Sequence, residues 1–384
     1  MWKSIFAISL DDFIKQIKDL NVNPKFIALY HTIEHDSQKI IEEINKNFET
    51  EIFGCTSFQG IFTPKGFTRG IGGLLSDEAY IEIKTAYSTF ETKTPYEAGK
   101  QMATKVKTEL KTEPDLIIMH ATPGFEEEII KGIEEILPEV DIIGGSAGDD
   151  DLSGKWVVLH KNGAIKNGVV IAGIKSKREI RTAFISGYFP TGKKGKVTKA
   201  KKRIIYEING KPAAEVYNEW TFGSIENELK SGGIVLPKTT LKPLAKIVGK
   251  IGAMNVYSLS HPEKVILPEK ALSTFTEWET GEEVILMNGT EKGLLKRTSM
   301  VVAQSLLGIK GKIDIKAGIL IYCAGCVNVV IKNADEIVKN YFEELGKEIP
   351  LIGPATFGEQ GRFFIEGKKV NKHANLMCNT ILFE

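Results

Sequence analysis

The sequence of 384 residues has little cysteine, almost no net charge and no long apolar run. Its four cysteines are too few for the disulfide framework of a small secreted protein. Because 50 basic side chains stand against 49 acidic ones, a surface devoted as a whole to nucleic acid or anionic membrane is excluded. The longest uncharged run, between Lys316 and Lys332, holds 15 residues, short of the roughly 20 that span a bilayer. We therefore predict a cytoplasmic protein without membrane insertion.

Three segments repeat the order strand, helix, strand: residues 26–54, 116–144 and 319–353. Each ends in glycine followed by small residues, and a unit of this length favours parallel strands joined by a right-handed crossover. Between the units, turns such as Asn162-Gly163 and Asn209-Gly210 indicate antiparallel hairpins. The predicted fold class is α/β, with repeated βαβ units in mixed β-sheets, interposed antiparallel hairpins and two related halves.

The length of the chain suggests two domains on a prior of about 150 residues each. Residues 223–243 contain the glycines and prolines typical of a connecting stretch. We place the boundary there, which divides the chain into residues 1–222 and 223–384.

The turns that end the three repeats are the best candidate binding sites. Ligands of open α/β sheets bind at the carboxyl ends of parallel strands, where glycine lets them approach the backbone closely. Small residues there can also serve only tight packing, and the threefold recurrence favours a shared site for a small polar molecule. The candidate residues in these turns are Gly54, Cys55, Thr56, Gly144, Gly145, Ser146, Asp149, Gly353, Thr356, Gly358 and Glu359.

The pair Cys323 and Cys326 has the spacing of a thioredoxin-like redox motif. The β-branched run 327–331 opens a helix poorly, so we expect the next helix to begin near Asn333. A buried cysteine usually acts as a small hydrophobe, and a thiol redox enzyme stays the alternative function. A zinc site would need two more ligands at a recognisable spacing. The sequence has no such second pair, so neither metal nor cofactor is predicted.

The segment 175–203 holds eleven basic residues and one acid, a local charge of +10. It could meet nucleic acid or another anionic partner. No aromatic residue stands among the lysines of 193–202 to form a stacking platform, so we interpret the segment as a solvated hairpin loop and predict no nucleic-acid partner.

Catalytic patterns are weak throughout the sequence. It contains no nucleophile elbow, no Walker loop and no dinucleotide fingerprint. Carboxylates beside glycine-rich turns more often bind or cap than catalyse. We therefore predict that the protein is not an enzyme.

Several motifs together resemble the FIST family over nearly the whole chain. In the N-terminal half they are the Gly-Cys-Thr turn at 54–56, the run 144–150 and the segments 197–200 and 206–213. In the C-terminal half they are Tyr322-Cys323-Ala324-Gly325, the run 353–359 and Asn375. The resemblance thereby adds Cys323, Gly325 and Asn375 to the candidate ligand-binding residues. The chain departs from the family pattern at Cys326, where arginine is usual, and at Pro354-Ala355, where two aromatic residues are usual.

The resemblance implies a sensory module of signal transduction that binds a small molecule such as an amino acid. The amides of Gly54, Gly145 and Gly353 would meet a carboxylate, and Glu359 would pair with an ammonium group. Such modules act through kinase, chemoreceptor or cyclase domains, and no such domain fits in 384 residues. The expected partners are therefore a small ligand and a signalling protein in trans.

Overall fold

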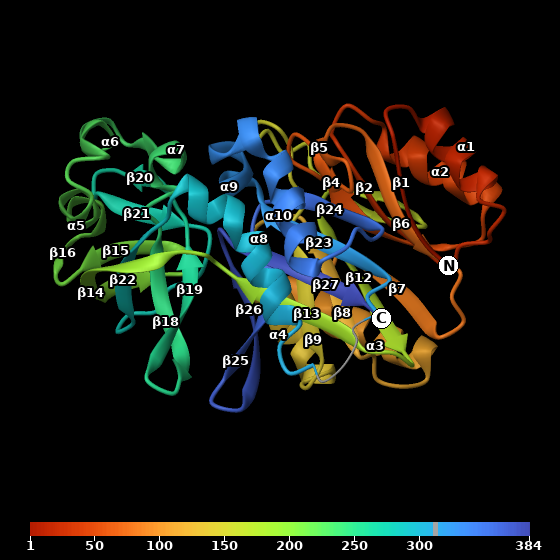
Figure 1. Ribbon diagram of the computed structural model, residues 1–384. Helices are drawn as coiled ribbons and strands as arrows, with labels where there is room; N and C mark the ends of the chain where they lie inside the picture. Colours follow the sequence, from red (N-terminus) through yellow and green to blue (C-terminus); the bar gives the residue numbers. More distant parts are fainter. Residues whose placement is uncertain (310–313) are drawn as a thin grey trace.

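The computed structural model describes residues 1–309 and 314–384, which form four β-sheets (Figure 1). Three sheets have six strands each, and the fourth has nine. In each six-stranded sheet, a parallel pair of strands lies at the centre and antiparallel strands flank it. The predicted α/β class with mixed sheets and repeated βαβ units is confirmed.

Three units share one element order: strand, helix, strand, helix, strand, hairpin, strand. The first unit is β1 (Trp2–Ala7), α1 (Leu10–Asp19), β2 (Phe26–His31), α2 (Ser37–Asn47), β3 (Glu51–Thr56), β4 (Ile61–Thr63), β5 (Gly66–Thr68) and β6 (Ile71–Ser76). The second is β7 (Ile81–Thr89), α3 (Pro95–Leu110), β8 (Leu116–Ala121), α4 (Glu126–Ile136), β9 (Asp141–Gly145), β10 (Val158–His160), β11 (Gly163–Ile165) and β12 (Gly168–Ser176). The third is β13 (Ile180–Ile185), α8 (Glu291–Ser305), β23 (Ala317–Cys323), α9 (Ala324–Val329), the 3-10 turn Ile331–Asn333, α10 (Asp335–Leu345), β24 (Leu351–Thr356), β25 (Glu359–Ile365), β26 (Lys368–Ala374) and β27 (Cys378–Phe383).

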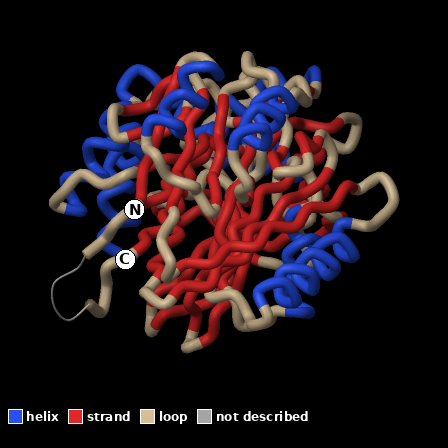
Figure 2. The backbone as a smooth tube through the Cα atoms, turned by 90° about the vertical axis from the view of Figure 1, so that its right-hand side faces the viewer, coloured by secondary structure: helices blue, strands red, loops and turns tan. Residues whose placement is uncertain are grey.

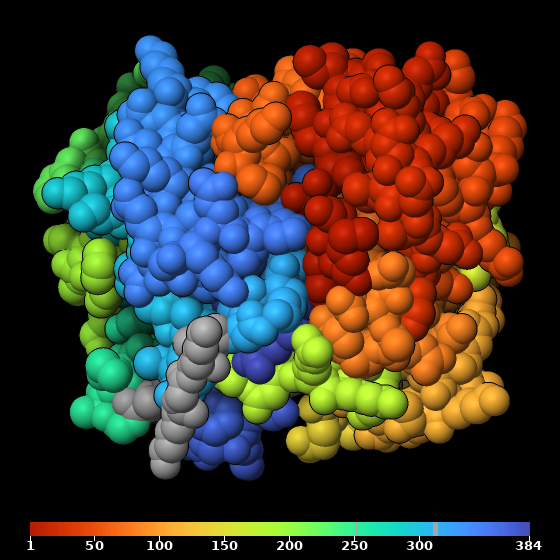
Figure 3. Space-filling model, turned by 45° about the vertical axis from the view of Figure 1, so that its right-hand side comes forward, coloured from red at the N-terminus to blue at the C-terminus, as the bar shows by residue number. Residues whose placement is uncertain are grey.

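Each unit gives its hairpin to the sheet of another unit. The strand β10 of the second unit pairs with β3 of the first, and β25 of the third pairs with β9 of the second. The strand β4 of the first unit pairs with β24 of the third, which closes the cycle. Accordingly, N-terminal and C-terminal segments lie side by side on the surface in Figure 3. We call these interlocked units the three-unit body.

An insertion of residues 189–288 separates β13 from α8, and we call it the inserted unit (Figure 1, left). Its strands are β14 (Phe189–Lys201), β15 (Ile204–Ile208), β16 (Lys211–Pro212), β17 (Gly233–Ile234), β18 (Leu244–Ile251), β19 (Met254–Ser260), β20 (Pro262–Ile266), β21 (Ala271–Thr274) and β22 (Glu283–Asn288). Its helices are α5 (Ala213–Trp220), α6 (Glu226–Ser231) and α7 (Leu236–Thr239). All of its strands belong to the nine-stranded sheet. The expected boundary between residues 222 and 223 falls between α5 and α6, and the division into 1–222 and 223–384 stays a prediction.

Local sequence fixes where α3 begins and how it packs against α4. Thr94 and Glu97 form a capping box, and Pro95 occupies the first turn of α3. The helices α3 and α4 cross where Gly99 and Gly132 let each backbone approach the other closely. This crossing places Glu126, the first residue of α4, beside the candidate site described below.

Both chain ends lie close together in Figures 1 and 2. The Trp2 ring stacks on the Phe383 ring with centroids 4.6 Å apart, so the first and last strands share one core. Within residues 1–309 and 314–384, no helix combines the length and apolar character needed to cross a membrane.

Two local expectations are wrong. A helix, α9, begins directly after Cys323 rather than near Asn333, because Cys326 and Val327 pack into a buried core that outweighs weak helix propensity. The basic segment 175–203 is mostly strand rather than a hairpin loop, since β14 pairs with both β15 and β22. Along β14 nearly all side chains are nevertheless at least partly exposed.

Candidate functional site

A cavity of about 330 Å³ lies between the three-unit body and the inserted unit. Its wall on the body side includes Phe58 after β3, Trp156 before β10 and Phe357 after β24. The inserted unit contributes Arg203, Leu236, Pro237, Thr240, His261 and Phe275. The wall is therefore built from parts of the chain that are far apart in the sequence, and several of them follow the carboxyl ends of parallel strands, where α/β folds bind ligands.

The three predicted turns meet behind this wall through a cycle of backbone hydrogen bonds. The N–H of Phe58 donates to Ala355 O (3.0 Å), that of Gly148 to Thr56 O (3.0 Å) and that of Phe357 to Ser146 O (2.9 Å). These amides are thus satisfied by neighbouring turns.

The structure divides the predicted site residues into two groups. On the cavity wall lie Cys323, Gly325, Thr356, Gly358 and Asn375. Off the wall, and largely buried, lie Gly54, Cys55, Thr56, Gly144, Gly145, Ser146, Asp149, Gly353 and Glu359. Whether any of them touches a ligand stays a prediction.

Three glycines off the wall have one shared packing role. A Cβ at Gly54, Gly144 or Gly353 would overlap the carbonyl oxygen of the adjacent parallel strand, at Leu29, Met119 and Leu320 respectively. Only glycine lets the two strands of each unit approach this closely. The recurrence of glycine at these positions is therefore explained by strand packing.

The remaining residues off the wall support the turns. Asp149 accepts hydrogen bonds from the N–H groups of Leu152 (2.6 Å) and Lys155 (2.9 Å), which shapes the loop before β10. The Thr56 hydroxyl accepts from Val157 N, and a Cβ on Gly145 would press on Thr356 at 2.6 Å. Burial raises the pKa of the Cys55 thiol, which lies 3.6 Å from His120 Nδ1.

Glu359 is fully buried behind Thr356. It accepts hydrogen bonds from the Thr356 hydroxyl (2.8 Å) and from Met377 N (2.9 Å). Burial nevertheless raises the pKa of Glu359 to about 8. Because its carboxyl is bonded to Thr356 and Met377 inside the protein, Glu359 is not among the residues that line the cavity.

Glu126 and Arg203 join the two parts of the molecule at the cavity wall. The Arg203 guanidinium lies 2.7 Å from the Glu126 carboxylate and also pairs with Glu127. The other Glu126 oxygen accepts from the Ser146 hydroxyl (2.6 Å). Burial alone would raise the pKa of Glu126, but the charges of His373 and Arg203, with these hydrogen bonds, lower it to about 2.

Glu126, Glu127 and His373 lie near enough together to hold a cation. The guanidinium of Arg203 already supplies positive charge to both carboxylates. Both ring nitrogens of His373 are engaged as well, with Gln360 Nε2 at 3.2 Å and Phe275 O at 3.1 Å. The donor set therefore serves an internal ion pair.

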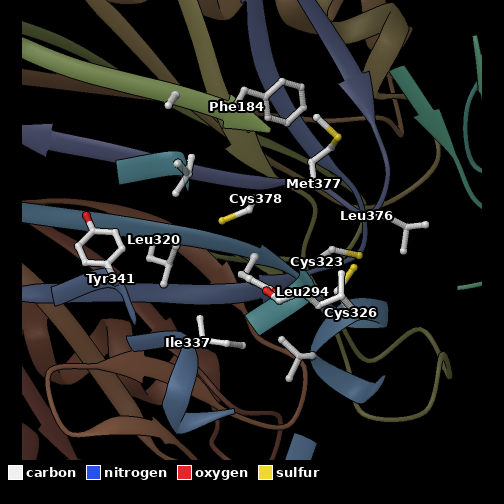
Figure 4. Close-up of a cluster of buried hydrophobic side chains, with 14 of the residues drawn as sticks. Phe184, Leu294, Leu320, Cys323, Cys326, Ile337, Tyr341, Leu376, Met377 and Cys378 are labelled. Atoms are coloured by element: carbon white, nitrogen blue, oxygen red, sulfur yellow. The ribbon is translucent and has the colours of Figure 1, made fainter. Parts of the chain in front are cut away.

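The second buried charge is Arg297 on α8. It lies beside the hydrophobic cluster that contains Cys323 and Cys326, and Figure 4 shows these two cysteines. Its Nη1 donates to Leu376 O (2.7 Å), and its guanidinium lies over the Tyr322 ring at 3.8 Å. Burial would raise the pKa of Cys326, but a hydrogen bond from Cys323 and the Arg297 charge lower it to about 6. By contrast, burial raises the pKa of Cys323 on the wall.

Sequence reasoning missed most of the apolar wall. An aromatic residue follows each glycine turn or the loop after it, namely Phe58, Trp156 and Phe357. This recurrence was the sequence signal that could have predicted the aromatic part of the wall. Nothing local marks His261 or Phe275, because only the position of the inserted unit brings them to the cavity.

Two individual proteins show partial similarity to this chain. A segment of 179 residues is 30% identical to the uncharacterized protein MJ1623 of Methanocaldococcus jannaschii, covering 44% of this chain and 34% of that protein. The chain thus matches about a third of that relative's length. Among solved structures, PurLQS from Thermotoga maritima aligns over 85% of this chain and 74% of that chain, with 11% identity and a TM-score of 0.23.

The family matches are extensive. The FIST N domain matches residues 25–211 and the FIST C domain matches residues 213–362. Both domains are associated with sensing in signal transduction, and the matches lend no support to the thiol redox alternative. Since the two matches cover nearly the whole chain and the motifs behind the cavity fall within them, this chain belongs to the FIST family.

Proposed function

We propose that this chain is a non-enzymatic cytoplasmic sensor that binds a small molecule in the cavity and signals to a separate protein in trans. The cavity carries the proposal: it has the size of a ligand site, apolar walls and a few polar groups. Its position between the body and the inserted unit would let a ligand bias how the two parts are held together. All four cysteines are free thiols, in agreement with a reducing compartment.

Gly325 offers a way to fill this cavity without disturbing the core. A Cβ there would lie at ordinary contact distance from Leu376 (3.5 Å), His261 (3.6 Å) and Cys323 (3.8 Å). Alanine should therefore be accommodated, whereas the larger leucine side chain in Gly325→Leu would occupy ligand volume.

Native mass spectrometry of the purified chain incubated with a cell metabolite extract tests the proposal. We expect a bound small molecule on the wild type and on Gly325→Ala, and at least a tenfold reduced occupancy on Gly325→Leu. Thermal unfolding checks that all three proteins are folded. Equal occupancy on Gly325→Leu, or no bound molecule on any of them, would contradict ligand binding in this cavity.

A further inference from the structure

The acidic and arginine side chains on the cavity wall are already paired and are not free to bind a charged ligand. Each acidic or arginine side chain on the wall already faces an opposite charge: Glu126 with Arg203 at 2.7 Å, Asp150 with Arg69 at 2.8 Å and Asp151 with Lys155 at 3.7 Å. A charged ligand group would have to displace one of these partners or lose its hydration without compensation.

The backbone amides of the three predicted turns are occupied as well. The amides of Phe58, Gly148 and Phe357, which might have met a carboxylate, donate to the neighbouring turns. The two histidines on the wall are also engaged, His373 with Gln360 and Phe275, and His261 with Thr240 at 3.4 Å. Burial lowers the pKa of His261 to about 4, so that ring is uncharged at neutral pH.

Aromatic rings line two sides of the cavity. On the body side, the Phe357 ring lies 6.1 Å from Phe58 and 5.9 Å from Trp156, measured between ring centroids. On the inserted unit, the Phe275 ring lies 6.2 Å from His261. Two groups of rings on opposite parts of the molecule suit a flat apolar body held between them.

A buried side-chain amide on the wall, that of Asn375, is available to a ligand. Asn375 is almost fully buried, and its Oδ1 accepts from His261 N at 3.0 Å, which fixes the orientation of the side-chain amide. Among the residues that the structure describes, Nδ2 of Asn375 donates to no acceptor, and Gly358 approaches it without covering it. This N–H group would meet a hydrogen-bond acceptor such as a carbonyl oxygen.

We propose that the cavity takes an uncharged molecule with a flat apolar ring and one carbonyl-type acceptor, rather than an amino acid. This inference rests on the proposed function, since it specifies what the same cavity binds. The ring lies between the two aromatic groups, and the acceptor meets Asn375.

Four probes that share one benzene ring test this inference: benzamide, benzoate, benzylamine and L-phenylalanine. They are neutral, anionic, cationic and zwitterionic at pH 7. We expect ligand-detected NMR titrations of the full chain to give benzamide a Kd at least tenfold below those of the other three. Gly325→Leu should abolish benzamide binding, and the matched Gly325→Ala should retain it.

Tighter binding of any charged probe, abolished by Gly325→Leu, would overturn the neutral-ligand inference and leave the proposed function standing. If no probe binds, and a wider panel of flat ring carbonyl compounds also fails, both proposals are wrong. Benzamide binding that persists in Gly325→Leu would place the ligand elsewhere and overturn both.

Discussion

The three-unit body and the inserted unit are held together in opposite ways. In the body, every six-stranded sheet is completed by a hairpin from another unit, so its strands come from distant parts of the chain. In the inserted unit, all nine strands come from one continuous segment, 189–288. The body can therefore form only as a whole, whereas the inserted unit carries its own sheet and its own hydrophobic cluster.

The cavity lies where these two kinds of structure meet. Hydrogen bonds cross between them from His261 N to Asn375 Oδ1 and between His373 and Phe275 O. The Arg203 ion pairs cross there as well. The interlocked body and its self-contained neighbour are joined at this cavity, so the proposed ligand would bind where it can change the position of one part against the other.

The largest effect is expected from cutting the body at the boundary of the family matches. Residues 1–211 alone would lose β25 beside β9 and β24 beside β4. This fragment should show no cooperative unfolding transition in circular dichroism, because several sheets are left with open edges and exposed cores. Residues 189–288, expressed alone, should unfold cooperatively. A cooperative transition for 1–211 would show that the hairpin exchange is dispensable.

A smaller effect is expected from a single methyl group placed in each region. In the body, Gly144→Ala puts a Cβ onto the carbonyl oxygen of Met119, and backbone on both sides must move. We expect a loss of at least about 3 kcal/mol in the free energy of unfolding by urea. The matched Gly195→Ala in the inserted unit meets only the side chains of Asn209 and Ile208, both at 2.8 Å.

Because these nearest contacts are side chains rather than backbone, Gly195→Ala should cost less than Gly144→Ala, about 1–2 kcal/mol. Equal losses at Gly144 and Gly195 would contradict the packing explanation for the repeated glycines.

The repeated units could be predicted from the sequence because each unit leaves a recognisable pattern within a short stretch of the chain. A strand, a helix and a glycine at the close approach of two strands leave a recurring pattern, as at Gly54, Gly144 and Gly353. The same glycines were natural ligand candidates, since close approach to a ligand and close approach to a neighbouring strand require the same missing side chain.

The hairpin exchange and the cavity could not be predicted in this way. The pairing of β4 with β24 joins residues from opposite ends of the chain, and hairpin turns look the same whichever sheet receives the hairpin. The early start of α9 has a similar cause, because burial of Cys326 is decided by the tertiary core rather than by propensity. Phe275 becomes a wall residue only through the placement of the inserted unit.

The smallest effect concerns the ion pair that joins the two regions. The pKa of Glu126 is about 2 in the folded chain, against an ordinary value of 4.5, so the unfolded state binds more protons at acid pH. Its contribution to stability is present above pH 4.5 and is lost as pH falls toward 2. Between pH 7 and pH 3.5 this group alone should remove on the order of 1 kcal/mol from the free energy of unfolding.

Glu126→Gln should therefore be less stable at pH 7. In urea titrations at both pH values, it should lose on the order of 1 kcal/mol less than the wild type on acidification. Glu128→Gln, in the same turn of α4, is the matched control, because Glu128 forms no ion pair within the described residues. If both variants keep the pH dependence of the wild type, the Glu126 carboxylate does not hold Arg203 as the geometry indicates. The inserted unit would then be fixed to the body by its other contacts, among them the hydrogen bonds of His261 with Asn375 and of His373 with Phe275.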